Sequence, residues 1–336
     1  MGMRAFINLF IAVTVLVALA VAGARADDNA PARSAGPGRI AALIGSMHDR
    51  DPMVRQEAAR SLGEAGDKAA VPALSESMSS DPDVTVRLIA LGSLSMIGDK
   101  SAIPVYEKAL TDVSEKVRQS AAQALSGFWG ETAHSILVNA LRTDPSPKVR
   151  RSVAEALGNP GIMGRYTAHK WSGTEITQAA LIQSLAEDKD YGVRAVSAAM
   201  LGKFKNSKSL DPLLKTLEKD ASVSVRAAAA ESLGLLEMPV RTVKPLLDVV
   251  YFEKDEMVVA GALKALKYSG DPRAGDAAVS VLRSPSAAVR WQAIDVIEEI
   301  RPKDAVGPLN EIAGDSYESE GVRHKAKLAL QALGEM

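Results

Sequence analysis

The side chains most able to do chemistry in this sequence are four histidines, but their spacing matches no metal-binding or catalytic pattern. They are His48, His134, His169 and His324, no two lie three or four residues apart, and none is followed by glutamate. Repeated His–Glu pairs of the kind that hold two irons are therefore missing. The sequence has no cysteine, which excludes disulfides and thiolate zinc sites. It also lacks the G-x-S-x-G, P-loop and dinucleotide-binding motifs. We predict no catalytic residue, no metal and no cofactor.

Arginines give the strongest pattern, because a Val-Arg pair recurs along most of the chain. The arginines are Arg55, Arg87, Arg118, Arg150, Arg194, Arg226, Arg290 and Arg323. A ninth copy has Val258-Val259 in its place. Successive copies are 31 to 33 residues apart, except for one step of 44 between Arg150 and Arg194. A charge that repeats with the fold indicates a structural role for these arginines rather than an anion-binding site.

The residues around each arginine predict a helix. Asp or Ser stands four residues before every copy, as a helix N-cap would. A small residue follows in most copies at the third position and a leucine or isoleucine at the seventh, which lie on one helical face. Glycines such as Gly66 and Gly98 end the helix. A preceding helix is marked by prolines such as Pro72, Pro104 and Pro245. Since one helix pair cannot bury its apolar face alone, the pairs must stack. We predict an all-α solenoid of about nine two-helix repeats over residues 39–336.

The combination of these positions over nine copies resembles HEAT repeats, most closely the short type named after phycobilisome lyases. In HEAT families an aspartate six residues before the arginine forms a hydrogen-bonded ladder between adjacent repeats. The matching residues are Asp49 and Arg55, Asp81 and Arg87, Asp112 and Arg118, Asp144 and Arg150, Asp188 and Arg194, and Asp220 and Arg226. In the last three copies Glu253, Ser284 and Tyr317 replace the aspartate, and Val259 replaces one arginine. We therefore expect a looser or differently curved C-terminal third.

The long step places an insertion within residues 159–178, which carries Arg165, Tyr166, His169, Lys170 and Trp171. The corresponding turn one repeat earlier carries Phe128 and Trp129. Loops added to a solenoid often lie on its binding face, and exposed aromatic and basic residues are typical of interaction sites. Either these residues bind a partner, or Trp129 and Trp171 fill the space that the insertion opens.

The second candidate surface is the helix that carries each arginine, on the face just after it. Repeat two has Leu88 there, repeat eight has Trp291, and repeats five to seven have small residues. A small apolar stripe can receive an extended or helical peptide. The alternative is that these small residues allow close packing between neighbouring helices.

The first residues predict export. A basic start and an apolar run precede Ala24-Arg25-Ala26, so residues 1–26 are typical of a signal peptide cleaved after Ala26. The alternative is an uncleaved anchor, although a membrane span needs about 20 apolar residues. Residues 27–38, rich in Pro and Gly, are expected to form a flexible linker. No stable membrane span is expected after cleavage.

The net charge of −1 gives no basic excess for binding nucleic acid. We predict a non-catalytic scaffold of the cell envelope, periplasmic or extracellular, that binds a protein or peptide. The alternative is an enzyme or enzyme accessory resembling HEAT-repeat bilin lyases or deoxyhypusine hydroxylases. A resemblance to bilin lyases implies a cytoplasmic substrate protein, and the export signal conflicts with that. The missing His–Glu pairs conflict with a deoxyhypusine hydroxylase.

Overall fold

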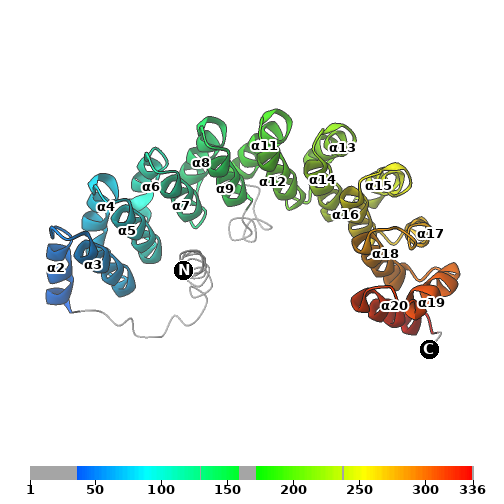
Figure 1. Cartoon of the computed structure of the whole chain (residues 1–336). Coiled ribbons are helices and arrows are strands. Elements are labelled where there is room, and N and C mark those ends of the chain that lie inside the picture. The colour runs from blue at the N-terminus through cyan, green and yellow to red at the C-terminus, as the bar shows by residue number, and fades with distance from the viewer. Residues whose placement is uncertain (1–35, 129, 159–171, 237, 335–336) are drawn as a thin grey trace. The chain divides into compact units, whose positions relative to one another are not determined.

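The structure, a computed structural model, describes residues 36–128, 130–158, 172–236 and 238–334. These residues form helices joined by short turns, with no strand among them. Their contacts divide the chain into two compact units. Figure 1 labels the helices of both units. In both units the helices come in pairs, and we call the first helix of a pair the A helix and the second, arginine-bearing one the B helix.

The described helices of the first unit form four pairs. They are α2 (Pro37–Ser46) with α3 (Pro52–Ala65), α4 (Val71–Ser80) with α5 (Val84–Ile97), α6 (Ile103–Ala109) with α7 (Glu115–Leu125), and α8 (Glu131–Thr143) with α9 (Pro147–Leu157). Each A helix packs on its own B helix, and the B helices α3, α5, α7 and α9 pack on one another in chain order. This is the stacking that the repeat predicts.

The described helices of the second unit form five pairs. They are α11 (Ser172–Glu187) with α12 (Tyr191–Gly202), α13 (Leu210–Lys219) with α14 (Val223–Leu235), α15 (Pro239–Phe252) with α16 (Glu256–Leu266), α17 (Pro272–Ser280) with α18 (Ala287–Ile300), and α19 (Val306–Gly314) with α20 (Glu320–Ala332). The B helices α12, α14, α16, α18 and α20 again pack in chain order. The predicted all-α solenoid of two-helix repeats is confirmed.

The predicted N-caps stand where B helices begin, but they act in two ways. Asp51, Asp83, Asp190 and Asp255 accept a hydrogen bond from a backbone N–H of the first turn. The serines that cap α7, α14 and α18 make no such side-chain bond. Ser319, the cap of α20, does accept one, from the N–H of Val322. An aspartate cap thus contributes more local hydrogen bonding than most serines in this chain.

The predicted core residues are buried in both units. The small residue three positions after the arginine and the leucine seven after it are fully covered, as Ala90 and Leu94 illustrate at 0% exposure. Gly66 and Gly98 end α3 and α5 in the left-handed conformation, with φ of 66° and 67°, which glycine adopts without steric cost. In α18 the same terminal position is Arg301, with φ of 58°.

Three boundaries differ from those expected. Pro37 and Gly38 already belong to α2, so the helical repeats begin inside the predicted linker. Residues 172–178 of the predicted insertion lie in α11. Pro245 lies inside α15, which begins at Pro239, because a second proline upstream occupies the first turn. Residues 1–35, with the predicted signal peptide, lie outside the described residues.

Candidate partner-binding surface

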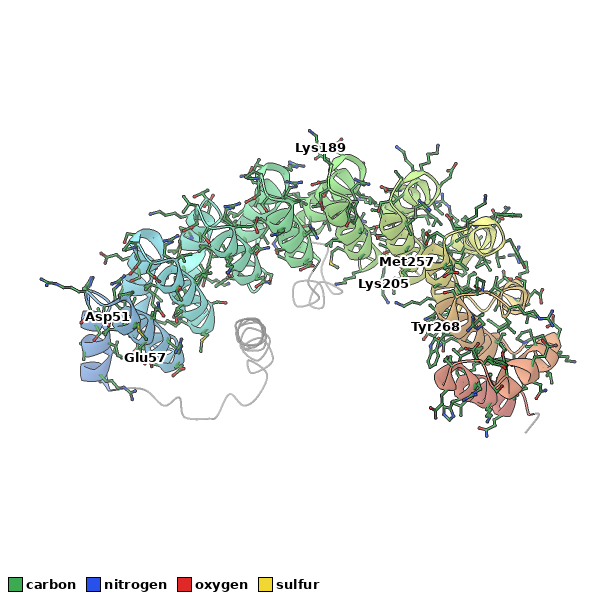
Figure 2. The ribbon with its side chains drawn as sticks, viewed as in Figure 1. Asp51, Glu57, Lys189, Lys205, Met257 and Tyr268 are labelled. Atoms are coloured by element: carbon green, nitrogen blue, oxygen red, sulfur yellow. The ribbon has the colours of Figure 1, made fainter. Side chains whose placement is uncertain are left out.

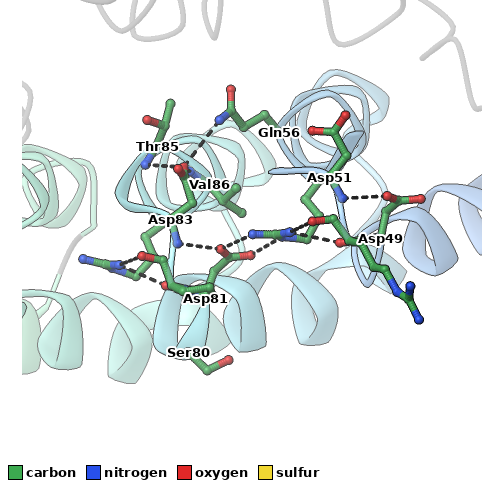
Figure 3. A network of polar contacts seen from close by, with 12 residues as sticks. Asp49, Asp51, Gln56, Ser80, Asp81, Asp83, Thr85 and Val86 are labelled. Atoms are coloured by element: carbon green, nitrogen blue, oxygen red, sulfur yellow. Dashed lines mark hydrogen bonds and ion pairs between the residues drawn. The ribbon is translucent and has the colours of Figure 1, made fainter. Parts of the chain in front are cut away.

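The arginine stripe forms a ladder that joins each repeat to the next. Nε and Nη2 of Arg55 donate to the two carboxylate oxygens of Asp81 in the next repeat, at 2.7 and 2.8 Å. Nη1 donates to the carbonyl oxygen of Asp49 in its own repeat, at 2.9 Å. Asp81 also accepts the backbone N–H of Asp83, the cap of α5, at 2.9 Å. Figure 3 shows this network, in which one guanidinium links two turns and one carboxylate positions a helix cap.

The same geometry repeats within each unit. Arg87 holds Asp112 and Arg118 holds Asp144 in the first unit, and Arg194 holds Asp220 in the second, each with Nε to carboxylate oxygen at 2.8 Å. These side chains are 4–17% exposed, so the pairs are largely shielded from water. These pairs, with that of Arg55 and Asp81, agree with the ladder that the resemblance to HEAT repeats implied. In these pairs the arginine binds the carboxylate of the following repeat, whereas the residue six positions before it accepts Nη1 through its backbone carbonyl.

Burial and hydrogen bonding act in opposite directions on the ladder carboxylates. Desolvation raises the pKa of Asp81, Asp112 and Asp220. The bonds from arginine and from a backbone N–H, with the neighbouring positive charges, outweigh it and hold the pKa below its ordinary value. The pKa of Arg87 is raised by its hydrogen bond to Asp112. Both partners are therefore charged over the physiological range, which suits a structural ion pair.

The ladder continues at two of the three positions where the sequence lacks the expected aspartate, and the looser or differently curved C-terminal third stays a prediction. Glu253 takes the place of aspartate and binds Nε of Arg226 at 3.3 Å. Arg290 binds Glu318 with both oxygens, at 2.6 and 2.8 Å. Tyr317 does not replace the acid, because the turn before α20 is two residues longer. Nη1 of Arg323 accordingly donates to the carbonyls seven and eight residues before it, whereas Nη1 of Arg290 donates to those five and six residues before it.

The ladder is interrupted between repeats seven and eight, where both members are changed together. Val259, in the arginine position, is 7% exposed and packs as an apolar residue. Ser284, in the acid position, accepts the N–H of the cap residue Ser286 at 3.2 Å. Because arginine and carboxylate are lost as a pair, neither charge is left buried without its partner. Apart from Arg323, the described ladder groups are thus engaged within the fold, which leaves the exposed faces as candidates for binding.

The B-helix face of the second unit carries a charged and aromatic cluster that joins three repeats. Asp295 of α18 binds Lys267, just after α16, at 2.8 Å and Lys325 of α20 at 2.6 Å. The ammonium of Lys325 also lies 4.6 Å from the ring centroid of Trp291, a cation–π contact. Burial raises the pKa of Asp295, but hydrogen bonds from the two lysines lower it below its ordinary value. We call these four residues the Trp291 cluster.

The Trp291 cluster is flanked by exposed apolar side chains. Trp291 itself is 40% exposed, Tyr268 is 76% exposed and Leu328 of α20 is 45% exposed. Tyr268 lies beyond the end of α16, away from Met257 at the start of that helix (Figure 2). The ammonium of Lys267 lies 5.2 Å from the Tyr268 ring. The sequence pattern pointed to Trp291 but not to Lys267, Asp295 and Lys325, which meet only when α16, α18 and α20 are set in register.

Two of the small residues in repeats five to seven, Ala227 and Gly261, serve packing between helices. Ala227 is 6% exposed, and a Cβ on Gly261 would lie 3.1 Å from the Ala227 carbonyl oxygen. That backbone contact supports the alternative in which small residues allow close approach of α14 and α16. Leu88 of the first unit is half-buried, so only part of its side chain is available to a partner.

The predicted aromatic patch is wrong at Phe128. Phe128 is 6% exposed and its ring lies 5.2 Å from the ring of buried Tyr106, so it fills the core beside α6. The nearby His134 is also buried, with Nδ1 2.9 Å from the Gly130 carbonyl oxygen. The other members of that patch lie outside the described residues, and their role stays a prediction: Trp129, Arg165, Tyr166, His169, Lys170 and Trp171.

No group of three His, Asp or Glu side chains among the described residues is arranged to hold a metal ion. No helix among those residues combines the length and apolar character that crossing a membrane needs.

Comparison with solved structures shows similarity to importin-β-type proteins. The chain aligns with Kap95p, in a structure about its effect on RanGDP, at 15% identity and a TM-score of 0.69, covering 89% of this chain and 46% of that one. It aligns with importin beta at 13% identity and a TM-score of 0.69, over 88% and 46% of the two chains. Kap121p bound to Nup53p gives 16% identity and a TM-score of 0.53, over 88% and 37%. At such identities the likeness concerns the fold alone, and this chain spans less than half the length of each.

Sequence comparison gives the family. No curated protein matches the chain. A family model described as HEAT repeats matches residues 37–126, 134–223, 178–267 and 210–284, which together make up more than half of the chain. The helix pairs and the arginine–carboxylate ladder agree with that match. This chain therefore belongs to the HEAT-repeat family.

Proposed function

We propose that this protein is a non-catalytic scaffold of the cell envelope that binds a protein or peptide on the B-helix face of its second unit. The observation that carries the proposal is Trp291, a tryptophan left 40% exposed although a lysine of the next repeat orders one side of its ring. Tryptophan and tyrosine are the residues most often responsible for binding energy in protein interfaces. We assign Trp291 the role of the central anchor for the partner.

The charges around Trp291 support this role because they are already ordered. Asp295 binds Lys267 and Lys325, and Lys325 also approaches Glu298 at 3.4 Å. A side chain ordered before binding loses less conformational entropy when the partner arrives. The ring is thus held in place without being covered.

The similar solved structures support binding of a protein rather than of a small molecule. Two of them are structures of Kap121p, bound to Nup53p and to the extreme C-terminus of the protein phosphatase Cdc14p. Those partners belong to Kap121p. We transfer only the general mode, in which a stack of helix pairs offers its surface to another protein.

Site-specific photo-crosslinking tests the surface. A benzoylphenylalanine placed at Leu328, beside the Trp291 cluster, is expected to form adducts in intact cells. The same probe at Val240, which is 96% exposed in the first turn of the A helix α15, serves as the matched control. Trp291→Ala should remove the Leu328 adducts without lowering the melting temperature. Equal adducts at both positions, or adducts that survive Trp291→Ala, would contradict the proposal.

The cell-envelope location rests on the signal-peptide pattern of residues 1–26. Mass spectrometry of protein recovered from fractionated cells is expected to find a mature chain that starts at Asp27, in the envelope or medium. A cytoplasmic chain that retains residues 1–26 would reject it.

Metal analysis addresses the enzyme alternative, because stoichiometric iron in the purified protein would overturn a non-catalytic role.

A further inference from the structure

Arg323 has the ladder position in the last described repeat, and no described repeat beyond it supplies an acid. Nη1 of Arg323 donates to the carbonyls of Asp315 and Ser316, at 3.4 and 3.3 Å. In Arg55, Arg87 and Arg194, Nε and Nη2 bind both oxygens of a carboxylate. Within the described part of the chain no carboxylate lies on Nε or Nη2 of Arg323. Among the described residues, Nε and Nη2 of Arg323 are thus left to bind a further carboxylate.

A surface concavity of about 360 Å³ lies at this position. Arg323, His324 and Lys327 of α20 line it, with Ser316 from the turn and Glu320 from the first turn of the helix. Basic residues exceed acidic ones among these side chains, so the concavity favours an anion. The planar guanidinium fork matches a carboxylate, and the same chain uses it for carboxylates of both aspartate and glutamate.

Lys327 argues against a second copy of this chain as the ligand. The residue four positions after the arginine lies against the next repeat and is apolar in all eight earlier copies, with 0–1% exposure. Those residues are Ala59, Leu91, Ala122, Ala154, Ala198, Ala230, Leu263 and Ile294. In the last repeat it is the exposed Lys327, and continued stacking would bury its charge. A polar outer face is what a terminal capping repeat needs.

We propose that the end of α20 is a carboxylate-binding site, in which Arg323 grips an aspartate or glutamate side chain from an acidic segment of another protein. Lys327 and His324 would lie beside that segment and add positive charge. The site stands on different residues from the Trp291 cluster, so it adds a second contact to a scaffold and does not depend on the first.

Nuclear magnetic resonance on the full chain tests the site with an acetylated, amidated hexaglutamate peptide, and with hexaglutamine as the uncharged control. The backbone amides of Gly314 and Ser316 are the reporters. Hexaglutamate is expected to shift both amides in a saturable manner, and hexaglutamine to shift neither. Arg323→Gln should raise the dissociation constant about tenfold or more, because a charge-assisted bidentate pair is lost.

Three comparisons decide whether the fork matters. Arg323→Lys, which keeps the charge and loses the fork, should lose most of the affinity, and Lys327→Gln should lose less. Lys254→Gln removes one exposed positive charge elsewhere in the second unit and should leave binding unchanged. Equal losses in Arg323→Gln and Lys254→Gln would overturn the proposal, since binding would then follow net charge.

Two further outcomes would also overturn it. Inorganic phosphate that shifts the same amides at equal or lower concentration would show a general anion site. Asp49, the ladder acid of the first repeat, would be the ligand if sedimentation found an oligomer that both Arg323→Gln and Asp49→Asn dissociate. We expect a monomer by sedimentation and the hexaglutamate shifts in the same preparation.

Discussion

At the scale of the residue, the arginine–carboxylate pair does two tasks at once. Arg87 holds the acid of the next repeat with Nε and Nη2 and the turn of its own repeat with Nη1. Asp112 in turn positions the cap residue Ser114 by accepting its N–H at 2.7 Å. This sharing explains why serine caps without a side-chain bond of their own can begin α7 and α14. The cap residue is fixed by the ladder.

Replacing one ladder acid should therefore cost more than an ordinary surface change. Asp112→Asn leaves Arg87 largely buried with an uncharged partner, and we expect a loss of about 3 kcal/mol in the free energy of unfolding at pH 7. Urea unfolding followed by circular dichroism measures it. The exposed Glu107→Gln in the same unit is the control and should change the value by less than about 0.5 kcal/mol.

The same pair predicts how that loss depends on pH. The folded-state pKa of Asp112 lies below its ordinary value. Its contribution is therefore complete above the unfolded-state pKa and disappears as pH falls through the folded one. The difference between Asp112→Asn and the unmodified protein should shrink steadily below about pH 4. A difference that stays constant down to pH 2 would contradict this assignment.

At the scale of the element, the ends of the B helices vary more than their beginnings. The left-handed terminal position is glycine in α3 and α5 but Arg301 in α18. A residue with a Cβ pays about 1–2 kcal/mol for that conformation, whereas glycine adopts it freely.

Arg301→Gly should therefore stabilise the second unit by about 0.5–1 kcal/mol, after allowing for the greater freedom of glycine in the unfolded chain. Thermal unfolding by calorimetry would register it as a rise in melting temperature. Gln331→Gly, at an exposed position inside α20, is expected to do the opposite by about 1 kcal/mol. If both changes lower the melting temperature, strain at Arg301 is not the reason.

The elements also show what a sequence can predict and what it cannot. Helix starts, apolar faces and the B-helix periodicity follow from residue types at fixed spacing, so they were predicted. The partner of Arg290 could not be predicted in this way. The turn before α20 is two residues longer, so no acid stands six residues before Arg323, and only the structure shows that Arg290 binds Glu318. Phe128 was misplaced because an aromatic after a helix reads the same whether it faces solvent or Tyr106. The Trp291 cluster depends on register between three helices, which spacing alone does not give.

At the scale of the whole molecule, both units depend on carboxylates that must stay ionised. Lowered pKa values occur at Asp81 and Asp112 in the first unit and at Asp220, Glu253 and Glu318 in the second. Each contributes stability above its unfolded-state pKa that is lost as pH falls through its folded pKa. We expect the melting temperature to hold steady from pH 7 to 5 and to fall below about pH 4. Circular dichroism melts at pH 7, 5, 4 and 3 measure it, and an unchanged melting temperature at pH 3 would refute it.

The glycines of the second unit have a mechanical consequence. A Cβ on Gly234 would lie 2.6 Å from Cα of Ala265, and one on Gly202 would lie 2.9 Å from Cβ of Ser232. Where main chain nearly touches main chain, no change of rotamer can absorb an added methyl group. The distance between neighbouring B helices is thus set here by contact between their backbones and not by interchangeable side chains. A ligand that spans α12, α14 and α16 would meet side chains at a constant interval and would have to match it.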